Sequence, residues 1–326
     1  MQLKMGQSRG FIMPNWEYYF KKVGGMNLIK QYWKSHVLLF AVLQFILLGK
    51  TKKSLELLRL CVSLKINHKL EKKYGKLIKE KNNDLVEQSS RKVWVYWYQG
   101  LENAPLVVRR CFGSVKKNLR GWDIVFIHKG NIDDYVTFPA FIKDKFEKGI
   151  IGQAHFSDLL RLELLIKYGG LWLDSTVYCS GDNISQSVLN SDLFVFQSLK
   201  PGADGHVTQM SNWLIWAKTN NHILIETQKL LYEYWRNYDF LVDYFIFHHF
   251  FSIVCRAFPE EAAKIPQFCN STPHILQLNF FKPYNEIMFN DLCIQTCFHK
   301  LSYKFNEVDM LKKETFFDKI INLGID

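Results

Sequence analysis

From residue 92 onward, segments typical of β-strands alternate with segments typical of helices. β-branched and aromatic residues fill "KVWVYWYQG", which ends at Gln99-Gly100, and "WDIVFIH", and we predict a strand in each. The segments "APLVVRRCFGSVKKNLRG" and "FPAFIKDKFEKG" are predicted helices, with Pro105 near the start of the first and Gly121 and Gly149 closing them. This order predicts an α/β protein with a mixed, mostly parallel sheet flanked by helices.

The largely apolar stretch "AHFSDLLRLELLIKYGGLWLDSTVYC", residues 154–179, carries Asp158, Arg161 and Asp174 near its edges. Ser157 is a suitable N-cap, leucines then recur at helical spacing, and two glycines end the predicted helix before a short buried strand. Asp158 and Arg161 share one face of the first helical turn. Asp174 follows the strand, at the sheet edge where open α/β proteins bind ligands. We therefore expect the three charges to meet in one cleft.

Each of these charges also has a purely structural explanation. Asp158 can cap its helix, Arg161 can pair with Asp158 or Glu163, and Asp174 can cap a loop. A carboxylate at a strand end also suits Mg²⁺ or Mn²⁺, which takes one or two protein carboxylates and completes its coordination with phosphate oxygens and water. The three charges together with "YGGLWLD" favour the second explanation, and Mn²⁺ or Mg²⁺ is the predicted cofactor.

The segment "SDLLRLELLIKYGGLWLDST" resembles the S-D-x-x-R…Y-G-G-x-W-x-D-x-[DT] signature of DxD-type sugar transferases of the bacterial capsular polysaccharide synthesis group. The segments "VWVYWYQGLENAPLVV", "SNWLIWAK", "DYFIFHHFF" and "FHKLSYK" resemble the same group in the same order, so the resemblance covers residues 92–305. It implies a GT-A fold with a Rossmann-like sheet. The implied activity is transfer of a hexose from a UDP-sugar to a lipid-linked oligosaccharide during capsule or surface-polysaccharide synthesis, with retention of configuration.

The resemblance also implies roles for individual residues. Asp174 binds the metal that bridges the donor diphosphate, Asp158 contacts the donor ribose or sugar, and Arg161 is a cation of the donor site. The end of the first strand holds the nucleobase through three residues, Trp97, Tyr98 and Gln99.

The second acid of the DxD motif is Thr176 in this chain. A hydroxyl is a poor substitute for a carboxylate as a ligand of a hard cation. Two alternatives follow: Thr176 acts through water, or His299 completes a metal site with Asp174 and Thr176. Lys300 then meets the diphosphate as a point charge.

Two further candidate catalytic residues, Asp243 and His248, lie in "DYFIFHHFF", which we predict to be one aromatic helix that also carries His249. One interpretation is that these side chains reach the acceptor side of the cleft. The other is that an aromatic helix belongs to the core. Gly202 and Gly205 in "KPGADGH" similarly indicate either a loop that closes over the donor or a plain surface turn.

The excess of positive charge lies at the N-terminal end. Residues 1–90 hold 17 of the 42 Lys and Arg and 6 of the 31 Asp and Glu, whereas the other 236 residues hold 25 of each. We predict a helical basic extension there. It contains an aromatic-basic opening around Trp16, an apolar helix over residues 37–48 and an amphipathic helix with an apolar face made of Leu55, Leu58, Val62, Ile66 and Leu70.

Two interpretations of this extension stay open. It either docks on an anionic membrane, as a peripheral protein on the cytoplasmic face, or packs on the main domain with a solvated charged face. The apolar run would rise only roughly 18 Å as a helix, so it does not span a ~30 Å hydrocarbon core. Nucleic-acid binding is not expected, because the remaining residues are neutral. Seven scattered cysteines favour reduced thiols in a cytosolic compartment.

These patterns divide the chain into a basic helical region over residues 1–90, a transferase domain over 91–305 and a tail over 306–326. A rival to the enzyme is a non-catalytic, membrane-associated scaffold of the polysaccharide assembly machinery that kept the fold after losing the second acid. Release of UDP from UDP-sugars separates the two.

Overall fold

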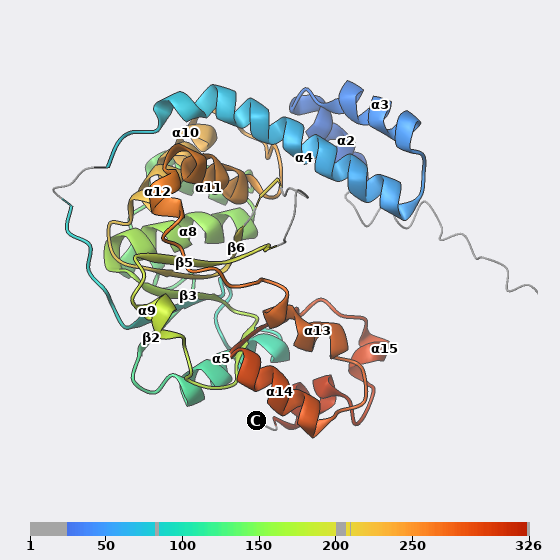
Figure 1. Cartoon of the computed structure of the whole chain (residues 1–326), viewed down its shortest axis with the longest axis vertical. Helices are drawn as coiled ribbons and strands as arrows, with labels where there is room; N and C mark the ends of the chain where they lie inside the picture. Colours follow the sequence, from blue (N-terminus) through green and yellow to red (C-terminus); the bar gives the residue numbers. More distant parts are fainter. Residues whose placement is uncertain (1–24, 82–84, 200–206, 209, 325–326) are drawn as a thin grey trace, which may run out of the picture. The chain divides into compact units, whose positions relative to one another are not determined.

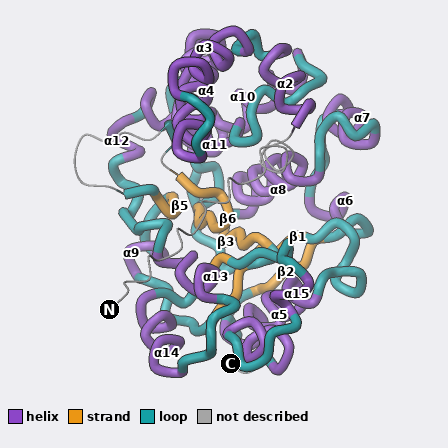
Figure 2. The backbone as a smooth tube through the Cα atoms, turned by 90° about the vertical axis from the view of Figure 1, so that its right-hand side faces the viewer, coloured by secondary structure: helices purple, strands orange, loops and turns teal. Residues whose placement is uncertain are grey.

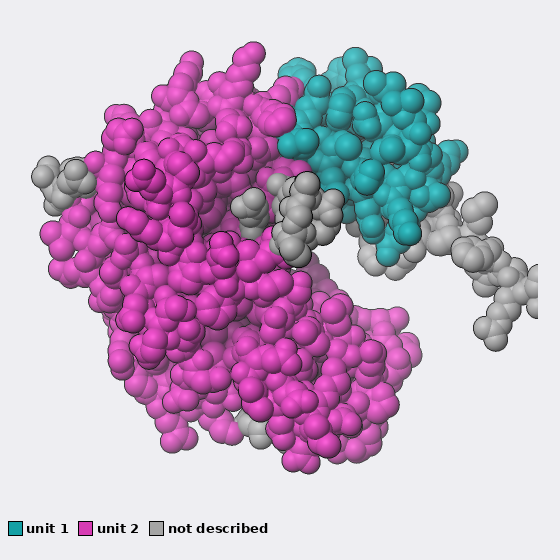
Figure 3. Space-filling view, in the orientation of Figure 1, with its two compact units in different colours: residues 1–66, 240–244 teal, residues 67–239, 245–326 magenta. Residues whose placement is uncertain are grey.

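The computed structural model describes residues 25–81, 85–199, 207–208 and 210–324 (Figure 1). The chain forms two compact units, one of residues 1–66 with 240–244 and one of residues 67–239 with 245–326 (Figure 3). The aromatic-basic opening around Trp16 and the loop with Gly202 and Gly205 lie outside the described residues.

The first unit contains α2 (Gly25–Lys34), α3 (Leu38–Leu48) and the first part of α4 (Lys52–Tyr74). Both predicted helices are present, and Leu58, Val62 and Ile66 of the amphipathic face are buried. The boundary between the compact units falls after residue 66, within the continuous helix α4. The sequence pattern, in contrast, changes near residue 90. Among the described residues, no helix is both long and apolar enough to cross a membrane.

The second unit is built on a five-stranded sheet in the order β2-β1-β3-β6-β5, which Figure 2 shows in orange. Its strands are β1 (Lys92–Tyr96), β2 (Asp123–Ile127), β3 (Gly170–Asp174), β5 (Leu193–Gln197) and β6 (Met210–Ala217). β1 pairs in parallel with β2 and β3, whereas β6 pairs antiparallel with β3 and β5. Four strands therefore run in one direction and β6 runs in the other, which confirms the predicted α/β fold with a mixed, mostly parallel sheet.

Helices cover both faces of this sheet. The connecting and covering helices are α5 (Leu106–Asn118), α6 (Ile132–Tyr135), α7 (Ala140–Glu147), α8 (Gln153–Tyr168), α9 (Gln186–Leu189), α10 (His222–Asn237), α11 (Ile246–Ala257) and α12 (Pro259–Ala262). Side chains alternate along β1, so Val93 and Val95 pack in one core cluster with Phe112 of α5, while Trp94 and Tyr96 contact aromatic rings of α8 on the opposite face. Figure 1 shows α8, α10 and α11 on that second side.

A second apolar cluster lies beyond α5, around the short sheet of β4 (Val177–Cys179) and β7 (Phe298–Lys300). Its helices are η2 (Thr272–His274), α13 (Ile275–Asn279), α14 (Glu286–Gln295), α15 (Glu307–Met310) and the π-helix η3 (Asp318–Leu323). The one remaining short helix among the described residues, η1 (Gly75–Leu77), is not part of this cluster and directly follows α4. Tyr178 of β4 and Cys111 of α5 belong to this cluster, so it packs directly on the element that covers the large sheet.

Gly169 and Gly170 join α8 to β3, as predicted, and both have positive φ angles, 64° and 99°. A Cβ atom on Gly170 would lie 2.4 Å from the carbonyl oxygen of Lys92, so β1 and β3 can approach only around a glycine. The predicted start of α8 was wrong. The helix begins at Gln153 after Gly152, one turn before Ser157, because the Phe156 amide already donates to the Gly152 carbonyl.

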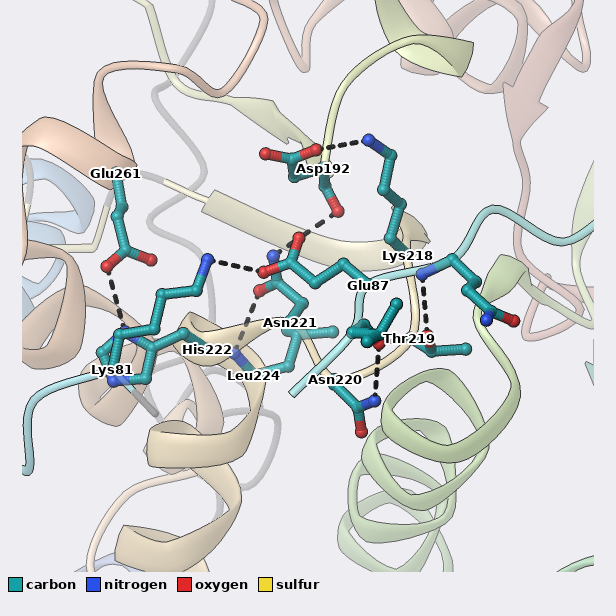
Figure 4. A network of polar contacts seen from close by, with 12 residues as sticks. Lys81, Glu87, Asp192, Lys218, Thr219, Asn220, Asn221, His222, Leu224 and Glu261 are labelled. Carbon is teal, nitrogen blue, oxygen red and sulfur yellow. Dashed lines mark hydrogen bonds and ion pairs between the residues drawn. The ribbon is translucent and has the colours of Figure 1, made fainter. Parts of the chain in front are cut away.

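Polar contacts hold the segment that follows α4 to other parts of the same second unit (Figure 4). Both ring nitrogens of His222 face acceptors at 3.0 Å, the carboxylate of Glu261 and the carbonyl oxygen of Lys79. Farther along, the amide and carbonyl of Gln88 bond to Thr219, and the Asn220 amide group donates to the carbonyl of Val86. Lys79, Val86 and Gln88 therefore all contact residues at or just before the start of α10.

Candidate functional site

Arg161 joins the two carboxylates that the sequence singled out. From α8 it donates one hydrogen bond to Asp158, at 2.5 Å, and another to Asp174 at the end of β3, at 3.1 Å. Its guanidinium lies over the ring of Trp172, 4.8 Å from the ring centre. Asp158 belongs to the second turn of the helix rather than the first, and it still shares a face with Arg161. The predicted convergence of the three charges is confirmed.

These residues differ in how far they can meet a ligand. The Arg161 side chain is 3% exposed and the Asp158 side chain 12%, whereas 28% of Asp174 is exposed. Burial raises the pKa of Asp158, but the charge of Arg161 and the nearby His155 ring outweigh this, so its pKa is lowered overall. Arg161 therefore holds the two carboxylates in place from the buried side of the site, and Asp174 is the acid that faces the solvent.

Lys300 supplies the accessible cation of this site. Its ammonium lies 3.1 Å from the Oδ2 atom of Asp174 and 2.6 Å from the Thr176 hydroxyl. β7 brings it there, because Lys300 pairs in register with Val177 and the Leu301 amide donates to the Thr176 carbonyl. Two carboxylates and two cations thus meet at this edge of the sheet.

Two residues of the site were not predicted. Asn212 of β6 donates to Asp158 at 2.8 Å, and the indole N–H of Trp172 donates to Asp174 at 3.1 Å. Asn212 lies in "SNWLIWAK", one of the segments that carry the resemblance, but nothing in its spacing indicated that it would meet Asp158. Trp172 is the tryptophan of the signature, but no role was assigned to it, because an aromatic residue is also typical of a buried strand.

The residues predicted to hold a nucleobase lie at the same edge. Tyr96 pairs in register with Asp174, so Trp97, Tyr98 and Gln99 follow directly beyond the sheet. The indole N–H of Trp97 is buried and has no hydrogen-bond partner in the described part of the chain. Its ring contacts Tyr303 edge to face, with 5.2 Å between the ring centres. A buried donor without a partner costs free energy, so it marks a place where a ligand can supply an acceptor.

His299 lies on the other side of β7 from Lys300, because side chains alternate along a strand. It is fully buried, its Nε2 atom lies 3.0 Å from the Ser180 hydroxyl, and burial lowers its pKa to about 4. The structure therefore brings Asp174, Thr176 and Lys300 together and does not bring His299 to them.

A divalent cation does not fit the donor set around Asp174 as it stands. One carboxylate oxygen accepts from Arg161 and Trp172, and the other from Lys300, so about three of its four acceptor positions are used. Thr176 is occupied by the same ammonium. In the part of the chain that the structure describes, no group of three or more His, Cys, Asp or Glu side chains is arranged to hold a metal ion.

The two remaining candidate catalytic residues, His248 and Asp243, belong to different compact units. His248 lies on α11, and the effect of its charge is the smallest of those that lower the pKa of Asp158. We predicted that Asp243 lies on the same helix as His248, which was wrong, because α11 begins only after Asp243. Aspartate favours turns and helix starts over helix interiors. Asp243 belongs to the first compact unit, where burial and its nearby charge raise the pKa of Tyr32 to about 12. The neighbouring His249 is a core residue, 3.0 Å from Asn67.

Comparisons with known proteins give several partial matches. The chain is 32% identical over 97 residues to the O-glycosyltransferase braB of Annulohypoxylon truncatum, an alignment that covers 27% of this chain and 23% of that protein. It is 31% identical over 101 residues to the glycosyltransferase afumC of Aspergillus fumigatus, covering 28% and 25%. The alignments thus span about a quarter of each relative. A solved structure, the PaToxG glycosyltransferase, superposes with a TM-score of 0.38 at 15% identity, over 81% of this chain and 98% of that one.

A family model has a much longer match. The model described as capsular polysaccharide synthesis protein matches residues 49–320, a range that includes Asp158, Asp174 and Lys300. Because this match covers most of the sequence, the chain belongs to the capsular polysaccharide synthesis protein family.

Proposed function

We propose that the protein is a glycosyltransferase that moves a hexose from a UDP-sugar to a lipid-linked oligosaccharide. The observation that carries the proposal is the convergence of Asp174, Lys300 and the unpartnered Trp97 indole on the carboxyl edge of the sheet. Open α/β sheets bind nucleotides at that edge. The family and the names of the relatives support the reaction type.

In the proposed complex each part of the donor meets a different group. The base lies against Trp97, Tyr98 and Gln99, the diphosphate lies near Lys300, and the exposed oxygen of Asp174 accepts from a hydroxyl of the sugar or ribose. Asp158 stays beneath them, held by Arg161. We propose that His248 contacts the acceptor from α11. The proposal does not include Asp243.

The proposed reaction proceeds with retention. The bond between sugar C1 and the β-phosphate oxygen breaks, and its electron pair stays on that oxygen. The acceptor hydroxyl oxygen bonds to C1 on the same face, and its proton passes to the departing β-phosphate. The protein contributes by positioning the two substrates and by stabilising the negative charge of the leaving UDP. The Mn²⁺ or Mg²⁺ ion stays a prediction of the resemblance, and no step of this proposal depends on it.

Release of UDP tests the enzyme against the scaffold. The purified chain is incubated with a panel of UDP-hexoses and a lipid-linked oligosaccharide, and UDP is measured. Asp174→Asn should slow release by about 100-fold, the scale of losing one group that stabilises a transition state. Asp144→Asn removes an exposed carboxylate paired with Lys148 and should have no effect. The scaffold is supported instead if no UDP-sugar releases UDP above the rate of Asp174→Asn.

We further propose that α3 docks the protein on an anionic membrane. Nearly every residue of α3 is apolar, yet Leu39 is 87% exposed and Ile46 is 71% exposed. Exposed Lys50, Lys52 and Lys53 follow it directly. An apolar helix that lies in the interface gains from its buried area, and each nearby lysine adds about 1 kcal/mol with anionic lipids. This location would bring the protein to its lipid-linked acceptor on the cytoplasmic face.

Point variants of the full chain test the docking. Leu39→Glu with Ile46→Glu should abolish sedimentation with vesicles that contain phosphatidylserine. Ile287→Glu with Ile294→Glu is the matched control, because both isoleucines are also about three-quarters exposed but lie on α14 of the second unit. Equal sedimentation of the two double variants would contradict docking through α3.

A further inference from the structure

A cation of the chain itself lies where the family resemblance predicts a metal ion. In "DST" the first and third residues, Asp174 and Thr176, are the positions of the two DxD acids. The Lys300 ammonium touches both, at 3.1 and 2.6 Å. It comes from β7, more than a hundred residues farther along the chain, so the contact is not a local pairing of neighbours.

The charges are balanced in a way that suits an ammonium. Two carboxylates carry a total charge of −2, which matches the charge of a divalent cation. One carboxylate and one hydroxyl carry a total charge of −1, which matches the charge of a single lysine. The Thr176 hydroxyl accepts a hydrogen bond from Lys300 without adding a negative charge that would repel a diphosphate. The substitution that weakens a metal site is therefore the one that accommodates Lys300.

The ammonium also keeps a donor for a ligand. A lysine has three N–H groups, and the contacts with Asp174 and Thr176 use two of them. The Lys300 side chain is 19% exposed, so the third can point to the solvent-facing side of the site. Arg161 cannot take this role, because it is buried and already bonded to both carboxylates.

We propose that the Lys300 ammonium takes the place of the divalent cation, so that the diphosphate of the donor is bound and leaves without a metal ion. This inference rests on the proposed function, since it assigns the cation of the same site. The third N–H of Lys300 donates to a β-phosphate oxygen and stabilises the charge that develops there as the bond to sugar C1 breaks.

Calorimetric titration of UDP into the full chain, with EDTA and with Mn²⁺, is the first test. UDP should bind the natural chain with equal affinity in both media. Lys300→Met, which keeps the stem and loses the charge, should weaken binding by about tenfold or more in EDTA. Lys218→Met is the matched control, since Lys218 pairs with Asp192 at 2.6 Å outside the site. Lys300→Ala repeats the test if the methionine variant does not fold.

Paramagnetic resonance of Mn²⁺ measures the same competition without nucleotide. Little Mn²⁺ should bind the natural chain, more should bind Lys300→Met, and most should bind Lys300→Met with Thr176→Asp, because two acids are then free of the ammonium. UDP binding that requires Mn²⁺ in the natural chain, or that is unchanged in Lys300→Met, would overturn the inference and leave the donor proposal intact. A chain that binds UDP in neither medium would overturn the proposed donor and this inference with it.

Discussion

Asn212 donates a hydrogen bond to Asp158, and this contact exists because β6 runs opposite to the other strands of its sheet. An antiparallel strand presents its first residues at the edge where its parallel neighbours present their last. The start of β6 therefore lies beside the end of β3, which carries Asp174. The reversed strand therefore supplies Asp158 with a neutral donor from its first residues.

Asn212→Ala should lower both stability and donor binding. The buried oxygen of Asp158 loses one of its two donors, which should cost about 1–3 kcal/mol in the free energy of unfolding. Asn212→Asp should be worse, because it sets a second carboxylate against the first. Urea unfolding measures the loss, and Asn237→Ala, at the exposed end of α10, is the control. An unfolding midpoint equal to that of the control would show that the contact contributes nothing.

Arg161→Met should destabilise the fold strongly. It leaves Asp158 buried without its charged partner, and breaking a buried ion pair costs about 3–5 kcal/mol. Arg236→Met breaks an exposed pair with Glu233 on α10 and should cost less than about 1 kcal/mol. Thermal unfolding of both variants provides the comparison. If the two melt together, the contacts of Arg161 with the carboxylates do not stabilise the fold.

Trp97→Phe should weaken UDP binding with little change in stability, because the lost N–H has no partner in the described residues. Trp94→Phe is the contrasting variant. The indole N–H of Trp94 donates to the Gly169 carbonyl at 2.9 Å, so its loss should lower the free energy of unfolding by about 1–3 kcal/mol. Calorimetry and urea unfolding of each variant measure the two effects. A large loss of stability at Trp97 without a loss of UDP affinity would contradict a role in the nucleotide site.

His299 should make the fold sensitive to acid. Its pKa falls from 6.5 to about 4 on folding because burial disfavours the charged ring. The unfolded chain therefore takes up the proton first, and the stabilisation present above about pH 6.5 is lost as the pH falls to about 4, up to about 3 kcal/mol. His299→Gln should lack this part of the pH dependence. Urea unfolding at about pH 7 and about pH 4.5 measures it, and parallel losses in both proteins would exclude His299 as the cause.

Local patterns were sufficient to predict much of the fold and the acidic half of the site. Alternating and helical apolar spacing gave β1, β2, β3 and the long helix α8 that precedes β3, and the glycine pair located the turn into β3. Because Asp158 and Arg161 are three residues apart on that helix, and Asp174 ends the next strand, their convergence follows from element geometry alone.

The rest depends on contacts between distant segments. Strand periodicity carries no information on direction, so the reversal of β6 and the contact of Asn212 were not predictable from it. Lys300 was a candidate cation, but only tertiary pairing of β7 with β4 brings it to Thr176. The predicted start of α8 was wrong because the residue before the helix, Gly152, provides no side-chain cap that could be recognised in the sequence. Ser157, in contrast, is of the residue type that usually caps a helix.

The strand that carries Lys300 is only three residues long and pairs with one short neighbour, so we expect it to open more often than the strands of the large sheet. When β7 opens, the amide of Leu301 loses the Thr176 carbonyl and becomes open to deuterium exchange. The same opening removes the ammonium from Asp174 and the Tyr303 ring from Trp97. The exchange rate of one backbone amide, at Leu301, therefore reports how often the site loses its accessible cation.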